Sequence, residues 1–356
     1  MLATARPSFR QAQLLQQLPE GDKMKTILSI DGGGVRGIIP LACLVQLEAK
    51  ERKPCREIFD MIAGTSTGAI VAAGLAIGVS ARGMLAIYRK LAESAFQALP
   101  FWKIARNLGN HRYSNEFIAR TLTELGADRE LNSLPVDILI TAKNTVTSRT
   151  DFFVRDNPGN ASLWGKLSLK DGVLASIAAP TYFPAHSAGL GGVEHTWVDG
   201  GVGVAGNPCY QAAVEAIHYS SGTYPPGSTR LLSFGTGSSP HPVDAKKASF
   251  LQWGEWVLSE LLEDAAEWQT YITRLEYDGT GRIDFRRYNL DLAPDVMEQL
   301  GVKVPPGADV TKIGLDSVWA IELLAEIGRA FAHRIDFQNP DGLVLRSKQG
   351  GAPPVF

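Results

Sequence analysis

Short apolar runs alternate along the chain with stretches that have the composition or spacing of helices. The short runs, typical of buried strands, are 26–30, 59–63, 136–142, 152–154, 196–199 and 231–234. The stretches typical of helices are 38–47, 69–76, 80–96, 114–125, 169–179 and 208–219. Because strands and helices alternate, the pattern predicts an α/β fold with helices on both faces of a central sheet.

The last third of the chain, from about residue 245, is richer in helical patterns. The segment 315–335 places Trp319, Leu323, Ile327 and Phe331 on one face of a predicted helix. Such a stripe is typical of a helix that packs against a core. We therefore expect all four side chains to be buried.

Two aromatic segments are candidates for contact with lipid. Segment 250–272 carries three tryptophans among acidic residues, whereas a helix on a membrane surface usually has a polar face rich in Lys and Arg. We expect this segment to pack in the core or against a partner. The loop 96–104, which contains Phe101 and Trp102, is the better candidate for a lid or an interfacial contact, with a plain buried loop as the alternative.

Composition divides the 356 residues into three parts. Residues 1–24 form a polar leader, 25–345 a single domain, and 346–356 a loose tail with Gly and Pro pairs. The longest apolar run, 69–79, is too short for a bilayer span of about 20 residues. The leader lacks the apolar centre of a secretion signal. The sequence therefore predicts a cytoplasmic protein with at most transient contact with a membrane surface, and it specifies no oligomeric state.

Charge and cysteine content narrow the chemistry. The formal net charge of −2 argues against a nucleic-acid polymer as a partner. The cysteines Cys43, Cys55 and Cys209 are far apart and have no metal-binding or redox spacing. We expect buried thiols in a reducing compartment, and neither a metal nor a cofactor.

The most informative motif is Gly64-Thr65-Ser66-Thr67-Gly68, a G-x-S-x-G between a predicted strand and a predicted helix of small residues. This context is that of a nucleophile elbow, in which Gly64 and Gly68 leave room for a sharp turn and a close helix. We expect Ser66 to be exposed at the carboxyl end of the sheet. Its backbone N–H, at a helix N-terminus, should face a developing negative charge. An ordinary serine in a Gly- and Thr-rich loop is the alternative.

A second glycine-rich loop, Asp31-Gly32-Gly33-Gly34-Val35-Arg36-Gly37, follows the strand 26–30 and precedes a helix that begins at Ile38. The N–H groups of Gly32, Gly33 and Gly34 can turn toward one point and form an anion site, which an acyl-transfer enzyme would use as an oxyanion hole. Arg36 would add a fixed positive charge beside it.

The same loop also satisfies G-x-G-x-x-G, the fingerprint of a dinucleotide site, through Gly32, Gly34 and Gly37. That interpretation requires an acidic residue about 20 residues further on, at the end of the next strand. The next strand ends in Ala63-Gly64-Thr65-Ser66, which contains no carboxylate. The sequence therefore disfavours a nucleotide cofactor.

A third element, Thr196-Trp197-Val198-Asp199-Gly200-Gly201, is a predicted strand that ends in an aspartate and two glycines. Asp-Gly alone signals a turn. Beside a serine nucleophile, however, a carboxylate can serve as the base if it is held within hydrogen-bond reach. Gly200 and Gly201 would let the backbone bend so that Asp199 reaches the serine.

Together the three motifs resemble the patatin-like phospholipase family, which carries D-G-G-G-x-R-G, G-x-S-x-G and D-G-G or D-G-A in this order. The stretches 175–184 and 232–237 are also patatin-like, and the resemblance covers about residues 25–240. It implies a three-layer α/β fold with a mostly parallel sheet. It also implies a Ser66–Asp199 dyad and an oxyanion loop at Gly32, Gly33 and Gly34, with Gly33 and Gly34 the favoured pair.

The resemblance implies a lipid acyl hydrolase that cleaves phospholipids, lysophospholipids or soluble acyl esters through an acyl-enzyme, without calcium. Three alternatives stay open. An α/β-hydrolase triad would need a histidine after Asp199, for which His218, His241 and His333 are available. A patatin-type storage or interaction protein would show little catalysis. A bacterial effector would need a small-molecule activator such as a cyclic dinucleotide.

Overall fold

The computed structural model describes residues 24–96, 111–157, 159, 163–239 and 243–348. Within these residues one nine-stranded sheet has the order β5-β6-β3-β2-β1-β7-β8-β9, and β4 pairs with β3 beside β6. The strands are β1 (Lys25–Ile30), β2 (Met61–Thr65), β3 (Asp137–Asn144), β4 (Thr150–Val154), β5 (His186–Leu190), β6 (Val193–Asp199), β7 (Thr229–Phe234), β8 (Asp284–Leu290) and β9 (Gly342–Leu345).

The sheet is mostly parallel, as expected. The six strands from β3 through β2, β1, β7 and β8 to β9 pair in parallel, whereas β4, β5 and β6 pair antiparallel at one side. In β1, Ile27 lies opposite Met61 of β2 and Leu231 of β7. The carboxyl ends of β1 and β2, where the two glycine-rich motifs begin, therefore meet at one edge of the sheet.

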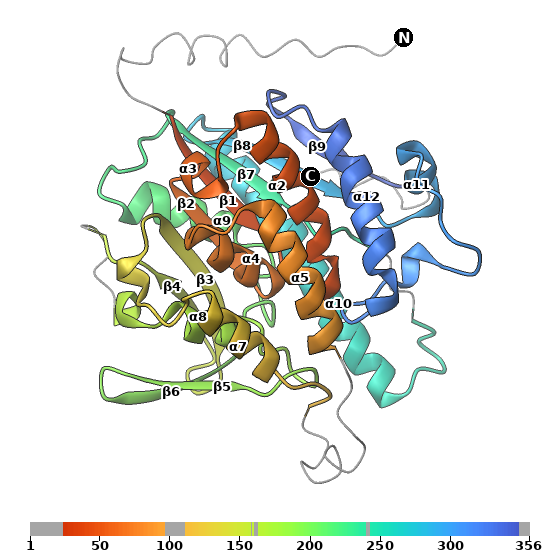
Figure 1. Ribbon diagram of the computed structural model, residues 1–356, viewed down its shortest axis with the longest axis horizontal. Helices are drawn as coiled ribbons and strands as arrows, with labels where there is room; N and C mark the ends of the chain where they lie inside the picture. The colour runs from red at the N-terminus through yellow and green to blue at the C-terminus, as the bar shows by residue number, and fades with distance from the viewer. Residues whose placement is uncertain (1–23, 97–110, 158, 160–162, 240–242, 349–356) are drawn as a thin grey trace.

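Helices cover both faces of the sheet, which gives three layers (Figure 1). One face carries α2 (Ile38–Glu51), α4 (Thr67–Ala76), α5 (Ala81–Ala95), α7 (Glu116–Glu124), α8 (Leu169–Ser176) and α12 (Ile321–Arg334). The other carries α9 (Cys209–Val214), against which α10 (Phe250–Thr273) packs. The short helices α3 (Cys55–Ile58) and α11 (Pro294–Leu300) contact α2 and α12, respectively.

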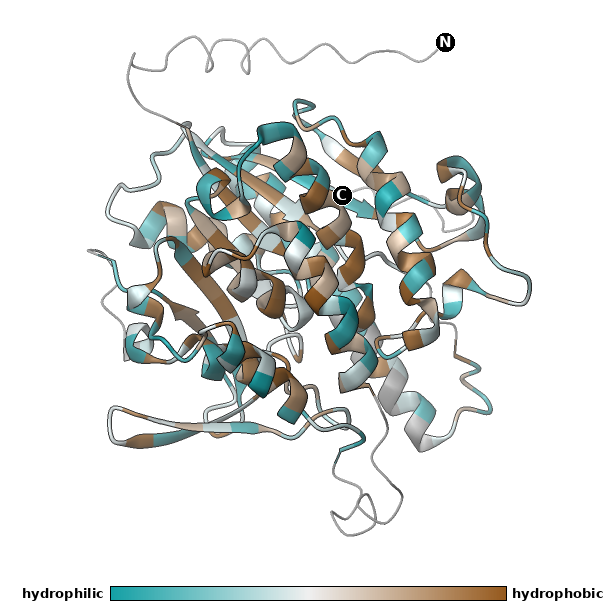
Figure 2. Ribbon diagram, viewed as in Figure 1, coloured by the Kyte–Doolittle hydropathy of each residue, from teal (hydrophilic) through white to brown (hydrophobic). Residues whose placement is uncertain are grey.

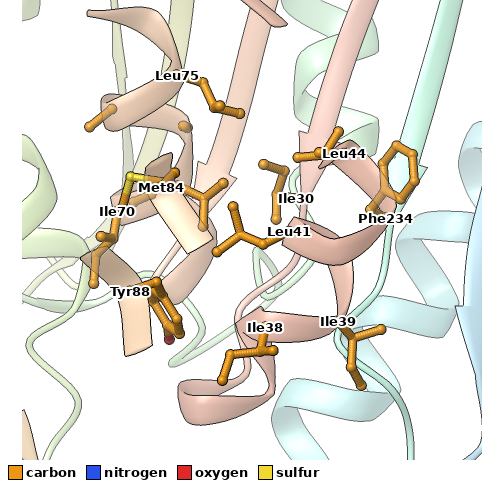
Figure 3. Packing of buried hydrophobic residues seen from close by; sticks show 14 of the residues in the cluster. Ile30, Ile38, Ile39, Leu41, Leu44, Ile70, Leu75, Met84, Tyr88 and Phe234 are labelled. Atoms are coloured by element: carbon orange, nitrogen blue, oxygen red, sulfur yellow. The ribbon is translucent and has the colours of Figure 1, made fainter. Parts of the chain in front are cut away.

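Alternating side chains of the central strands fill two cores. In β1, Leu28 and Ile30 join the larger cluster beneath α2, α4 and α5, whereas Ile27 points to the smaller cluster beneath α9. Figure 3 shows Ile30 and Phe234 beside Leu41 and Leu44 of α2. Because both faces are covered, apolar residues occupy both sides of each central strand, and Figure 2 shows these strands as predominantly apolar.

The structure departs from the sequence-based expectations in the last third. The predicted helix at 315–335 begins only at Ile321, after a 3-10 turn (Val318–Ala320). Leu323, Ile327 and Phe331 are buried as predicted, but Trp319 is 56% exposed, so its predicted burial is wrong.

Another departure concerns two strands. For 250–272 core or partner packing was expected; Trp268 of α10 is 51% exposed and so is not a core residue, and packing against a partner stays a prediction. The strands β8 and β9 extend the sheet in a region that was expected to be mainly helical.

Several expectations fall on residues outside the described ranges. The leader, apart from Met24, the lid candidate beyond Phe96, and the tail from residue 349 all lie there. Among the helices that the structure does describe, none is both long enough and apolar enough to cross a bilayer.

Candidate active site

Ser66 occupies the sharp turn between β2 and α4. Its backbone has φ 53° and ψ −121°, which a residue with a side chain adopts only under strain. Such a turn is characteristic of a nucleophile elbow. The Ser66 N–H donates a hydrogen bond to Ser176 Oγ, 2.8 Å away at the end of α8. The expectation that this N–H faces a developing charge is therefore wrong; instead its bond to Ser176 stabilises the strained turn.

The two glycines of the elbow allow α4 to pack very close to the sheet. A Cβ on Gly64 would lie 2.2 Å from the carbonyl oxygen of Gly68. A Cβ on Gly68 would lie 2.2 Å from the carbonyl oxygen of Ile30, the last residue of β1. The elbow therefore lies directly beside the start of the second glycine-rich loop, as the sheet order requires.

Asp199 ends β6, where it lies opposite Ala142 of β3. Its N–H donates to the carbonyl oxygen of Ala178, and its Oδ1 accepts a hydrogen bond of 2.8 Å from the Gly201 N–H. A Cβ on Gly200 would lie 2.1 Å from Thr141 Oγ1, so the chain can approach β3 here only with glycine. These contacts fix the carboxylate in place.

Asp199 is buried and lines the same pocket as Ser66. Burial raises the pKa of Asp199 to about 6, while the nearby Ser66 hydroxyl and the hydrogen bond from the Gly201 N–H act in the opposite direction. A carboxylate with this pKa is ionised at neutral pH and is a stronger base than an exposed carboxylate. The pair therefore combines a strained serine with a proton acceptor.

No histidine is among the described residues that line the pocket around this pair. His218 lies in the π-helical turn after α9 and meets the edge of the Tyr277 ring, with 6.2 Å between ring centroids. His333 lies in the last turn of α12 and is exposed. His241 lies outside the described residues.

The N–H groups of the glycine-rich loop differ in their partners. The Gly32 N–H, expected to be one of three oxyanion donors, instead donates to the carbonyl oxygen of Gly206 at 2.9 Å. The N–H groups of Gly33 and Gly34 have no acceptor in the described part of the chain, and both residues line the pocket that contains Ser66. Only this pair, the favoured one, therefore remains available to an oxyanion.

The carbonyl oxygens of Gly32, Gly33 and Gly34 are all hydrogen-bonded. The Gly33 oxygen accepts from the Arg36 N–H at 3.1 Å, and the Gly34 oxygen accepts from Tyr88 Oη at 2.6 Å and from Thr67 Oγ1 at 2.8 Å. Gly34 also has a φ of 55°, and a Cβ there would lie 2.0 Å from the Leu315 carbonyl oxygen. The peptide orientations of the loop are therefore fixed before any substrate arrives.

The Arg36 side chain points away from the pocket of Ser66 and lines a separate small cavity behind the glycines of the loop. Its side chain is buried, and its guanidinium lies 3.2 Å from the Glu263 carboxylate of α10. The Nε group approaches the Gly33 carbonyl oxygen at 3.5 Å. The charge of Arg36 is thus matched by Glu263, and its contact with the loop is through the backbone of Gly33.

The pocket around Ser66 is mainly apolar. Asp199 is the only charged residue among the described residues that line it. Its apolar wall comes from α4, α5, α7, the segments after α8 and β6, and the segment before α12, through Ile70, Leu91, Ala92, Ala95, Phe96, Ile118, Ile177, Phe183, Val202 and Leu315. Such a wall suits an uncharged aliphatic chain.

Several residues that hold the site together were not singled out from the sequence. They are Ser176, Tyr88, Thr236, Glu263 and Arg287. Ser176 and Thr236 lie in the two patatin-like stretches, which was the signal available for them. Tyr88, Glu263 and Arg287 carry no local signal, because each acts on a loop far away in the sequence.

No group of three or more His, Cys, Asp and Glu side chains in the described residues is placed to hold a metal ion. The three cysteines are buried and unpaired.

Comparisons with known proteins agree with the motifs. A family model described as patatin-like phospholipase matches residues 28–213. A cGAMP-activated phospholipase of Vibrio cholerae is 30% identical over 262 residues, which cover 66% of this chain and 73% of that protein. Another cGAMP-activated phospholipase, from Escherichia coli, is 29% identical over 240 residues, which cover 64% of this chain and 66% of that protein. Patatin-07 of Solanum tuberosum is 26% identical over 277 residues, which cover 70% of this chain and 71% of that protein.

Among solved structures, VipD from Legionella pneumophila aligns over 91% of this chain and 72% of that one, at 12% identity and a TM-score of 0.37.

Proposed function

Because the chain belongs to the patatin-like phospholipase family, we propose that it is a lipid acyl hydrolase with a Ser66–Asp199 dyad. The observation that carries the proposal is that both residues line one apolar pocket, in which Asp199 is the only charged residue among the described lining residues. The strained backbone of Ser66 and the raised pKa of Asp199 support the assignment of nucleophile and base.

In the proposed reaction, Ser66 Oγ attacks the carbonyl carbon of an acyl ester while Asp199 accepts the serine proton. The N–H groups of Gly33 and Gly34 bind the oxyanion of the tetrahedral intermediate. Collapse of the intermediate breaks the ester C–O bond, and the alcohol leaves with the proton from Asp199. A water molecule then gives a proton to Asp199 and attacks the acyl-enzyme. The bond between Ser66 Oγ and the acyl carbon breaks, Asp199 returns the proton to Ser66 Oγ, and the fatty acid is released.

The proposed substrate is an ester with an aliphatic acyl chain: a phospholipid, a lysophospholipid or a soluble acyl ester. The apolar wall fits the acyl half of such a molecule, and no cation among the described lining residues would draw a phosphate into the pocket. We therefore propose that the headgroup stays outside and that the protein contacts a membrane surface transiently, from the cytoplasm. Residues 25–345 would act as one catalytic unit, because β8 and β9 belong to the same sheet as β1 and β2.

Hydrolysis of a chromogenic acyl ester and of mixed phospholipids, with Ser66→Ala as the control, tests the proposal. Loss of a serine nucleophile costs on the order of 10⁶ in turnover. A fluorophosphonate should label the wild-type protein once, at Ser66, and should not label Ser66→Ala. Absence of turnover on every ester, with and without cyclic dinucleotides, would favour a storage or interaction protein, and activity retained in Ser66→Ala would overturn the dyad.

The second candidate is the same enzyme under control by a small molecule. Its support is that relatives from Vibrio cholerae and Escherichia coli are named cGAMP-activated phospholipases. Phospholipid hydrolysis measured with and without cyclic dinucleotides decides between the two candidates. A large increase with one of them favours the regulated enzyme, and equal rates favour an enzyme that needs no activator.

A further inference from the structure

The orientation of the peptide group between Gly32 and Gly33 decides whether the Gly33 N–H can serve an oxyanion. In a trans peptide the C=O of one residue and the N–H of the next point in opposite directions. The Gly32 carbonyl oxygen accepts a hydrogen bond of 2.7 Å from Thr236 Oγ1. Whatever holds this oxygen therefore also holds the Gly33 N–H on the opposite side, toward the pocket that contains Ser66.

Thr236 lies behind the loop and does not line the pocket of Ser66. It lines a separate small polar cavity with Gly32 and Arg36. Thr236 is buried, and it packs so closely against the loop that a Cβ on Gly33 would lie 2.2 Å from its Oγ1. A residue in this place touches the loop without touching a substrate.

The position of Thr236, which follows the carboxyl end of β7, is itself fixed by the neighbouring strand β8. The N–H of Gly235 donates to the Tyr288 carbonyl oxygen at 2.8 Å, and the N–H of Gly237 donates to Asn289 Oδ1 at 3.1 Å. Both acceptors belong to β8. The residues before and after Thr236 are therefore both hydrogen-bonded to β8. Through its own hydroxyl, Thr236 connects β8 to the glycine-rich loop.

From these contacts we propose that Thr236 is a positioning residue of the oxyanion hole. Its hydroxyl fixes the Gly32–Gly33 peptide, so that the Gly33 N–H points at the oxyanion in the transition state. The proposal rests on the proposed function and adds a residue to it. Without the hydroxyl the peptide can rotate, and stabilisation of the transition state weakens while binding of the uncharged substrate is kept.

Thr236→Val removes the hydroxyl and keeps the branched shape, whereas Thr236→Ser keeps the hydroxyl. On a soluble chromogenic ester we expect Thr236→Val to lower kcat roughly 10- to 100-fold, less than the loss of a donor outright. KM should change by no more than about twofold, because ground-state binding is unaffected. The rate of inactivation by a fluorophosphonate, whose phosphoryl oxygen occupies the same hole, should fall in parallel. Thr236→Ser should restore kcat to within about threefold of wild type.

Thr229→Val is the matched control. Thr229 is also buried, at the start of β7, and its hydroxyl bonds to the Pro225 carbonyl oxygen at 2.9 Å, away from the loop. A folded Thr236→Val protein with the kcat of Thr229→Val, or with a change in KM alone, overturns the proposal.

If Thr236→Val does not fold, Thr236→Ala replaces it. If neither folds while Thr236→Ser does, the hydroxyl serves stability and the proposal also falls. Ser66→Ala, assayed in parallel, separates the failure of this proposal from the failure of the proposed function. Activity retained in Ser66→Ala would contradict the proposed function itself.

Discussion

Asp31 and Arg287 form a buried, bidentate ion pair between the end of β1 and the middle of β8. Arg287 Nη1 lies 2.9 Å from Asp31 Oδ1, and Nη2 lies 2.5 Å from Oδ2. Nη1 also donates to Ser233 Oγ of β7 at 2.8 Å. Asp31 is the first residue of the glycine-rich loop, so the pair anchors the loop at the point where it leaves the sheet.

We expect Asp31→Asn to destabilise the protein strongly, because it leaves the Arg287 guanidinium buried without its counter-charge. Breaking a buried pair from one side typically costs about 3–5 kcal/mol. Urea unfolding measures this loss. Glu322→Gln is the control, since the Arg89–Glu322 pair at 3.3 Å is exposed at its carboxylate and should contribute less than about 1 kcal/mol. Equal small effects of both substitutions would contradict the anchoring role.

Asp199→Asn should abolish most activity. Asparagine keeps the shape of the side chain, and its amide oxygen can still accept from the Gly201 N–H, but it cannot accept the Ser66 proton. A general base contributes about 10²–10⁴-fold, and kcat on a chromogenic ester measures the loss. His218→Ala, His241→Ala and His333→Ala should leave kcat near the wild-type value. The reverse result, an inactive histidine variant beside an active Asp199→Asn, would replace the dyad by an α/β-hydrolase triad.

The activity should rise with pH through the pKa of Asp199. Only the ionised carboxylate can accept the serine proton, and burial raises its pKa to about 6. The profile of kcat/KM should therefore show an ascending limb near pH 6, which reports the free enzyme. A limb that stays near pH 4 would contradict the raised pKa of Asp199.

The same pKa makes a prediction for stability. Well below pH 3.8, the ordinary pKa, the carboxyl is protonated in both states, so its burial has no ionic cost. As pH rises from about 4 to above 6, the unfolded chain releases the proton first, and the folded state loses up to about 3 kcal/mol of stability relative to it. Asp199→Asn should therefore be more stable than wild type at pH 8 and equal to it near pH 3.5. Equal urea midpoints at both pH values would argue against the buried charge.

Gly33→Ala and Gly34→Ala should impair turnover more than substrate binding. A Cβ on Gly33 would meet Thr236 at 2.2 Å, and one on Gly34 would meet the Leu315 carbonyl oxygen at 2.0 Å. Either clash must move the loop and turn its N–H groups away, and loss of one such donor costs about 10²–10³ in kcat. Gly189→Ala is the control, because a Cβ there has no neighbour within 4 Å among the described residues. Near-normal kcat in both loop variants would mean that the oxyanion is stabilised elsewhere.

We also expect full activity in excess EDTA. In the proposed mechanism the N–H groups of Gly33 and Gly34 stabilise the oxyanion, a task that calcium performs in calcium-dependent phospholipases. Initial rates before and after dialysis against EDTA, on the same phospholipid vesicles, provide the measurement. Activity that disappears with EDTA and returns with calcium would contradict this prediction.

The strands that the sequence predicted best are those that consist of a continuous run of apolar residues. Residues 26–30 and 136–142 became the central strands β1 and β3, because a strand covered on both faces needs apolar residues at nearly every position. Strand β8 was missed since its pattern is broken by Arg286 and Arg287, whose burial is stabilised by Asp284 and Asp31. Asp284 lies two residues before Arg286 in the same strand, but Asp31 becomes visible as the partner of Arg287 only when β1, β7 and β8 are placed side by side.

The sequence by itself determined the three motifs, their order, and the backbone of the elbow, because the glycine spacing and the strand–turn–helix context are local properties. It also indicated Gly33 and Gly34 as the favoured donors. Only the tertiary structure decided that the Gly32 N–H is used by Gly206, that the Ser66 N–H is used by Ser176, and that Trp319 is exposed. The two hydrogen bonds depend on partners more than 100 residues away in the sequence, and the exposure of Trp319 depends on which distant segments fail to cover it. A hydrogen bond between distant segments leaves no periodic trace in either of them, so the strand order of the sheet had to be known first.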